Sequence, residues 1–177
     1  MDLQDFEAQS LYFENEPSVE VGALLTAAAE AYGTDSAEPS LLRAYFLEPE
    51  HLTVLVALYR YYYYQHRYQD AFRVAERAMD ICARRLELRC SWEQLTLRTL
   101  SGGVIRSMTL TRFYLMALKG AGYLQLRMGE TRSGLARLEK VEELDVQDRM
   151  GVRTLVQIAR QELRRQELEA HPNVISI

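Results

Sequence analysis

The residue types that most often carry chemistry are few in this sequence and far apart. The three histidines, His51, His66 and His171, are scattered along the 177-residue chain. No two of them stand four positions apart, the spacing that places two metal ligands on one helix face. Cys82 and Cys90 do not form a CxxC pair, and we interpret them as free thiols packed as small residues along one helix. The sequence therefore indicates no metal site, no cofactor and no enzyme.

Two further polar stretches have structural interpretations. Ser101-Gly102-Gly103 lacks the lysine and the preceding glycine of a phosphate-binding loop, so it is interpreted as a flexible turn. Glu142 and Glu143 are expected on a solvated helix face. Binding rather than catalysis is the function class that these residues favour.

Composition and charge limit the kinds of partner that this protein is expected to bind. Hydrophobic residues make up 48% and charged residues 26%, which is typical of one soluble folded domain. The net charge of −4 disfavours a general affinity for nucleic acid or an anionic membrane. The chain has no apolar run long enough to cross a bilayer, and its acidic N-terminus lacks the pattern of a secretory signal. We therefore expect a cytoplasmic protein.

Apolar residues recur at helical spacing along the whole chain, and strand-like alternation is nearly absent. This periodicity predicts an all-α fold of about seven helices joined by short turns. The predicted helices span residues 19–32, 37–47, 50–65, 69–88, 110–128, 131–144 and 148–168.

The spacing of apolar and small residues also repeats. In residues 52–85, six residues mark a helix–turn–helix unit of 34 residues: Leu55, Leu58, Tyr62, Ala71, Ala75 and Ala78. Moving back by the same period maps Ala71 onto Ala37 and Ala78 onto Ala44. A third, more divergent unit places Gly134 where Ala71 stands, and it carries Leu118, Ala121, Gly122, Gly129, Leu138 and Val141 at matching positions.

This pattern resembles the tetratricopeptide repeat (TPR) family. The resemblance implies antiparallel helix pairs stacked as a short right-handed solenoid. It divides the chain into an acidic N-terminal arm (1–17), one domain (18–169) and a C-terminal tail (170–177). The domain consists of three units at about 18–51, 52–85 and 115–148, an insertion at 86–114 and a capping helix at 149–169.

In the insertion we expect extended ends of the neighbouring helices and an irregular connection near Gly102-Gly103. One face of the capping helix is expected to pack on the third unit through Val152, Leu155, Val156, Ile158, Ala159 and Leu163.

In this family the first helices of each pair line a concave groove that holds a partner. Carrying the alignment over places nine residues of the second and third units there: Thr53, Val56, Arg60, Tyr63, Tyr64, Met116, Lys119, Tyr123 and Arg127. The first unit contributes the small residues Gly22, Thr26 and Ala29. Arg60 and Lys119 are expected to form a positive rim that pairs with an acidic ligand.

Four consecutive tyrosines, Tyr61 to Tyr64, cannot all face the groove, because successive helical residues turn by about 100°. We expect Tyr59 and Tyr62 in the core, Tyr61 between helix pairs, and Tyr63 and Tyr64 in the groove.

The resemblance implies a protein–protein interaction module, such as an adaptor, scaffold or assembly factor. Its partner would be a protein or peptide with an acidic or aromatic segment. Three alternatives stay open: a small dedicated chaperone similar to those of bacterial secretion systems, a helical regulatory domain that senses a small ligand, and a homodimer. Members of the TPR family that bind the C-termini of chaperones hold the two terminal carboxylates with Lys and Asn residues of the first helices. We expect no such clamp here, because Gly22, Thr26 and Ala57 stand at the corresponding positions. The arm, which mixes acidic and aromatic residues, is hypothesised to occupy the groove or to cap the first helix pair.

Overall fold

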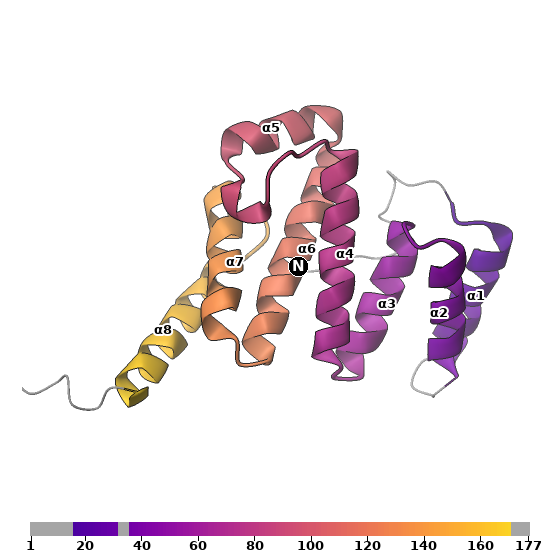
Figure 1. The fold of residues 1–177 in the computed structure, drawn as a ribbon, viewed down its shortest axis with the longest axis horizontal. Coiled ribbons are helices and arrows are strands. Elements are labelled where there is room, and N and C mark those ends of the chain that lie inside the picture. The colour runs from indigo at the N-terminus through magenta and orange to yellow at the C-terminus, as the bar shows by residue number, and fades with distance from the viewer. Residues whose placement is uncertain (1–15, 32–35, 171–177) are drawn as a thin grey trace, which may run out of the picture.

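The structure is a computed structural model that describes residues 16–31 and 36–170, and this part of the chain is helical without a strand (Figure 1). Within these described residues, eight α-helices stand where about seven were expected, and the all-α prediction is confirmed. Their bounds are α1 Val19–Glu30, α2 Ala37–Leu47, α3 Leu52–Tyr64, α4 Tyr68–Arg85, α5 Leu97–Arg106, α6 Met108–Arg127, α7 Thr131–Leu144 and α8 Arg153–Ala170.

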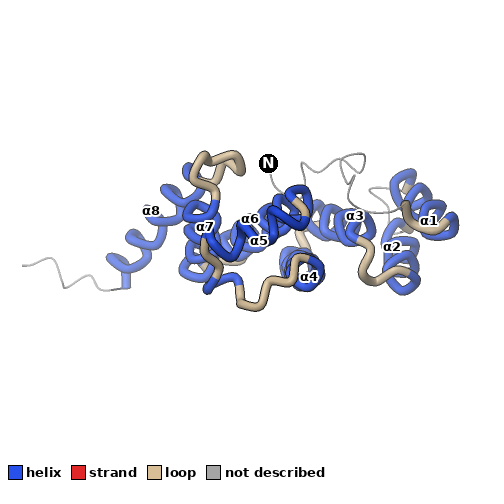
Figure 2. The backbone as a smooth tube through the Cα atoms, turned by 90° about the horizontal axis from the view of Figure 1, so that it is seen from above, coloured by secondary structure: helices blue, strands red, loops and turns tan. Residues whose placement is uncertain are grey.

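Most helices that follow one another in the chain also pack against one another, and α4 packs on α6 beyond the intervening α5. Within pairs, α1 contacts α2, α3 contacts α4, and α6 contacts α7. Between pairs, α2 contacts α3, α4 contacts α6, and α7 contacts α8. The helices therefore form a row with the α1–α2 pair at one end and α8 at the other (Figures 1 and 2).

Local side-chain chemistry sets where several helices begin. At the start of α1 the Ser18 hydroxyl accepts a hydrogen bond from the Val21 amide, and at α6 Ser107 does the same for Leu110. Thr96 and Thr99 exchange side-chain and backbone hydrogen bonds at the start of α5 and form a capping box. The turn from α6 to α7 passes through Gly129, whose φ of 82° suits a residue without a Cβ.

Two helices approach each other very closely where α6 crosses α7. A Cβ atom added to Gly134 would lie 2.7 Å from the Gly122 carbonyl oxygen and 2.8 Å from the Leu126 Cδ2 atom. A Cβ on Gly122 would lie 3.0 Å from the Gly134 carbonyl oxygen. The two glycines therefore let the backbones of α6 and α7 come almost into contact.

The insertion differs from the expectation. The interpretation of Ser101-Gly102-Gly103 as a turn is wrong, because both glycines lie inside α5. Leu95, just before α5, and Leu100, within it, are buried, and their burial, together with the capping box, stabilises a helix that two glycines would otherwise weaken. Arg106 donates a hydrogen bond to the Leu86 carbonyl over 3.0 Å and so ties the end of α5 to the end of α4. The insertion is thus a folded element packed on α6.

The last helix begins later than expected, at Arg153 rather than at residue 148. Gly151 has a φ of 62°, and an Asp148 carboxylate oxygen accepts from the Val152 amide over 2.7 Å, so this segment forms a turn. Val156 and Ala159 are buried, whereas Ile158, which was expected on the packed face, is 56% exposed. Only a narrow stripe of α8 therefore packs against α7.

We predict that Gly134→Ala lowers the free energy of unfolding by about 1–3 kcal/mol, because the added methyl group overpacks the α6–α7 crossing. Gly22→Ala is the matched control, since Gly22 lies in α1 with no atom within 4 Å of its added Cβ. It should stabilise the protein by up to about 1 kcal/mol through helix propensity. Urea unfolding followed by circular dichroism measures both changes, and equal stability of the two variants would contradict the close crossing.

Candidate binding groove

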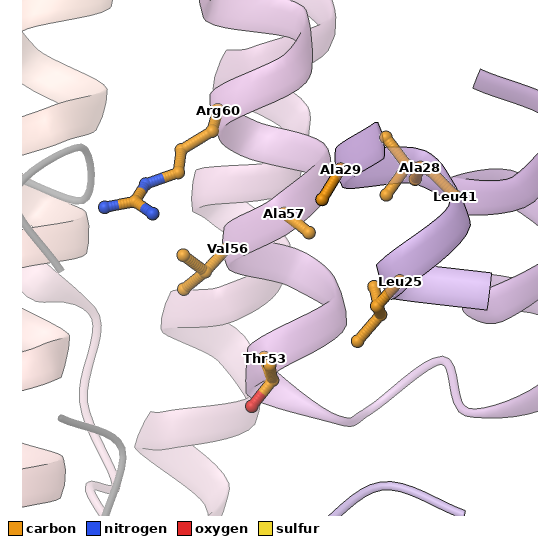
Figure 3. A pocket seen from close by; sticks show the side chains of 8 residues that line it. All are labelled: Leu25, Ala28, Ala29, Leu41, Thr53, Val56, Ala57 and Arg60. Carbon is orange, nitrogen blue, oxygen red and sulfur yellow. The ribbon is translucent and has the colours of Figure 1, made fainter. Parts of the chain in front are cut away.

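An apolar pocket of about 230 Å³ lies between α1 and α3 (Figure 3). Its lining comes from the first two helix pairs and consists of Leu25, Ala28, Ala29, Leu41, Thr53, Val56, Ala57 and Arg60. Figure 3 shows the Arg60 guanidinium extending away from the α1 side of the pocket. The pocket can therefore enclose an apolar group while a cation stands beside it.

Small residues create this pocket. Ala28 and Ala29 on α1 lie opposite Ala57 on α3, and larger side chains at these positions would fill the space between the helices. On α3, Thr53, Val56 and Arg60 recur at helical spacing and so share one face.

A cluster of aromatic side chains continues the same face of α3 beyond Arg60. We call Tyr63, Tyr68 and Tyr123 the tyrosine cluster. The ring centroid of Tyr63 lies 5.9 Å from that of Tyr68 and 6.3 Å from that of Tyr123, so α3, α4 and α6 meet here. Tyr64, beside Tyr63, is 57% exposed.

Arg127 of α6 lies on the tyrosine cluster. Its Nη2 atom donates to the Tyr68 hydroxyl over 2.6 Å, and its Nη1 atom donates to the Tyr123 hydroxyl over 3.3 Å. The guanidinium carbon lies 4.8 Å from the Tyr68 ring centroid, a cation–π distance. The hydrogen bond to Tyr123 raises the pKa of Arg127 above its usual value. An arginine side chain is in any case charged at physiological pH.

The pocket and the tyrosine cluster belong to one surface, which we call the candidate groove. Val56 and Tyr63 are seven residues apart on α3, which corresponds to about 10 Å along the helix axis at 1.5 Å per residue. Arg60 lies between them on the same face. An apolar site and a cationic aromatic site thus follow one another along α3.

The structure brings together most of the residues predicted for the groove. Thr53, Val56 and Arg60 line the pocket, and Tyr63, Tyr123 and Arg127 meet at the tyrosine cluster. The burial of the tyrosines on α3 is as predicted, because Tyr59, Tyr61 and Tyr62 are buried while Tyr63 is half-buried and Tyr64 exposed.

Met116 and Lys119 do not belong to this surface. Met116 is 1% exposed and Lys119 is 5% exposed. The Lys119 ammonium group donates to the Met150 carbonyl over 2.8 Å, so it connects α6 to the segment that precedes α8. The expected positive rim of Arg60 and Lys119 is therefore wrong in its second member, and Arg127 provides a cation on the candidate groove instead.

Several groove residues were missed from the sequence. Leu25, Ala28 and Leu41 of the first pair line the pocket together with Ala29, whereas Gly22 and Thr26 do not. The three-residue spacing of Leu25 and Ala28 on α1 was the available signal. Tyr68, which lies one residue before the predicted helix at 69–88, is the first residue of α4 and joins the tyrosine cluster.

A buried arginine was also missed. Arg137 of α7 is 7% exposed, and it donates to Glu76 over 2.8 Å and to Gln125 over 2.9 Å. Its guanidinium carbon lies 4.6 Å from the Trp92 ring centroid and 5.3 Å from that of Phe72. This residue holds α4, α6, α7 and the insertion together.

We predict that Arg137→Ala lowers the free energy of unfolding by about 2–3 kcal/mol, because it leaves Glu76 and Gln125 without their donor in a largely buried site. Arg132→Ala is the matched control on α7: the Arg132 side chain is 78% exposed and pairs with an exposed Glu167. Its effect should stay within about 0.5 kcal/mol. Urea unfolding followed by Trp92 fluorescence distinguishes the two, and an equal loss in both variants would refute the role of Arg137.

Three other features were sought. In residues 16–31 and 36–170, no three His, Cys, Asp or Glu side chains are grouped closely enough to hold a metal ion. None of the helices described there has the length and apolar character of a membrane span. The hypothesis that the N-terminal arm (1–17) occupies the groove or caps the first helix pair rests mainly on residues 1–15, which lie outside the described residues.

Comparison with known proteins gives one informative match. No family model matches the sequence, and no solved structure matches it. A protein of Azotobacter chroococcum mcd 1, described as an uncharacterized 19.8 kDa protein in the nifW 5′ region, is 46% identical over 158 residues. The alignment covers 89% of this chain and 88% of the relative.

Proposed function

This chain belongs to the same family as the Azotobacter chroococcum nifW 5′ region protein, and from its candidate groove we propose that it is a protein–protein interaction module. It binds an extended segment of a partner protein along α3 and acts as an adaptor, scaffold or assembly factor in the cytoplasm. The relative's place in the nifW 5′ region makes the products of that region the first partners to test.

The proposal includes a TPR-like solenoid as the scaffold. Three antiparallel pairs, α1–α2, α3–α4 and α6–α7, pack in chain order, and α8 follows the last pair. Small residues occupy the helix crossings, with Ala71, Ala75 and Ala78 buried on α4 and Gly122 and Gly134 between α6 and α7. Such packing supports a short right-handed stack whose first helices offer one continuous face.

The pocket between α1 and α3 is the observation that carries the proposal. Its apolar walls suit one apolar side chain, and the tyrosines beyond Arg60 offer large contact areas with hydrogen-bonding tips. Tyrosine and arginine are also the residue types that contribute most binding energy in protein interfaces. A pocket for one apolar side chain, followed by a surface of aromatic and cationic side chains, is typical of a site that binds an extended segment of a partner.

A small-ligand sensor is the second candidate, since the pocket also fits a compact apolar molecule. Its volume of about 230 Å³ falls below the ~300–1,000 Å³ common for ligand pockets, which favours a single side chain of a larger partner. A dedicated chaperone is a narrower form of the interaction module, with one client in the same groove.

We predict that Ala29→Trp fills the pocket and reduces partner capture at least tenfold. Ala27→Trp is the matched control, because Ala27 is an exposed alanine of the same helix outside the pocket lining. The experiment captures proteins from extracts of the native host on each immobilised full-length variant and quantifies them by mass spectrometry. The expected result is at least one protein held by the wild type and Ala27→Trp and lost by Ala29→Trp.

Thermal unfolding of the variants checks that both remain folded. If every captured protein binds Ala29→Trp as well as the wild type, the pocket is not a partner site. A metabolite screen by thermal shift separates the second candidate. Stabilisation by a small molecule that Ala29→Trp abolishes, without any pocket-dependent protein, would replace the interaction module by a ligand sensor.

A further inference from the structure

We propose that Arg127, held by the tyrosine cluster, is a carboxylate-binding subsite of the candidate groove. The partner segment then carries an Asp or Glu side chain two or four positions from the apolar side chain that enters the pocket. This inference rests on the proposed function and specifies the chemistry of the partner.

The first argument is the surroundings of Arg127. Many arginines of this chain pair with a carboxylate of the protein itself, among them Arg43, Arg67, Arg84, Arg106, Arg132, Arg137, Arg160 and Arg165. Within the described part of the chain, no carboxylate lies at ion-pair distance from Arg127. Glu130, the acidic residue nearest in sequence, accepts from Gln125 over 3.0 Å. The exposed Arg127 guanidinium on the groove can therefore bind an anion that comes from outside the described residues.

The second argument is that Arg127 is held in place. Its two hydrogen bonds to Tyr68 and Tyr123 and its position over the Tyr68 ring orient the guanidinium before any partner arrives. A guanidinium has five N–H donors, and the two tyrosine hydroxyls account for two of them. The remaining donors suit a carboxylate, whose two oxygens match the guanidinium fork. Because the side chain is already ordered, binding loses less entropy than it would at a mobile arginine.

The third argument is distance. The pocket, represented by Val56, and the cluster, represented by Tyr63, are about 10 Å apart along α3. An extended segment advances about 3.3 Å per residue, so about three residues cover this length. Side chains on one side of an extended segment recur at every second residue. A segment that follows α3 would therefore carry its apolar and acidic side chains two or four positions apart.

The test selects a phage library of random dodecapeptides on three full-length proteins: the wild type, Arg127→Gln and Ala29→Trp. We expect peptides enriched on the wild type to combine an apolar residue with Asp or Glu two or four positions away. Peptides selected on Arg127→Gln should still share the apolar residue but no longer share the acidic residue. Peptides selected on Ala29→Trp should no longer share the apolar residue.

Synthetic peptides then measure the size of the effect. An enriched peptide labelled with fluorescein is compared, by fluorescence anisotropy, with the same peptide carrying Asn or Gln in place of its acidic residue. The wild type should bind the acidic peptide about tenfold more tightly, which corresponds to about 1.4 kcal/mol. Arg127→Gln should bind both peptides equally. Arg132→Gln, which removes an exposed arginine of α7, should keep the tenfold preference.

The possible failures are distinguishable. If wild-type peptides share an apolar residue that depends on Ala29 but show no acidic preference, the carboxylate subsite is refuted and the groove stands. The same holds if the acidic preference persists in Arg127→Gln. If no enriched peptide depends on Ala29, both the subsite and the proposed function are refuted.

Discussion

The rest of the structure depends on how closely small residues allow neighbouring helices to approach. Gly122 and Gly134 bring α6 and α7 together so tightly that an added Cβ would lie 2.7 Å from a backbone oxygen. On α4, Ala71, Ala75 and Ala78 are buried in the helix that packs against both α3 and α6. Between α1 and α3, small residues have the opposite effect. Ala28, Ala29 and Ala57 leave a space there, which is the pocket. Close crossings build the row of helices, and the same residue types create its pocket.

Charged side chains divide into two groups by their surroundings. Arg137 and Lys119 are buried, and their hydrogen bonds join segments that are distant in the sequence. Both residues stabilise the arrangement of α6 with its neighbours. Arg127 is exposed and is held by tyrosine hydroxyls instead of a carboxylate. A cation that is ordered without a charged partner among the described residues is suited to recognition, whereas a buried, hydrogen-bonded one is suited to structure.

Local sequence patterns account for most of the helices but not for all. The helices at 37–47 and 131–144 have the predicted bounds, since their flanking turn residues mark both ends clearly. α5 was missed because Ser101, Gly102 and Gly103 are typical of a turn. Its helix is stabilised by burial of Leu95 and Leu100, a tertiary effect that outweighs low helix propensity. In the candidate groove, Arg60, Tyr63 and Arg127 were predicted from the alignment with the repeat family, whereas Leu41 was not predicted.

The sequence by itself determined that the chain is helical, which tyrosines of α3 are buried, and that Val56, Arg60 and Tyr63 share one face. These properties follow from the fixed turn of about 100° per residue, which is local. Only the tertiary structure decided that Met116 and Lys119 are buried, that Arg137 is enclosed by Trp92 and Phe72, and that Arg127 meets Tyr68. Periodicity defines the direction of a side chain within its own helix. Burial and contact depend on which distant segment covers that helix, and at what distance, which no local pattern encodes.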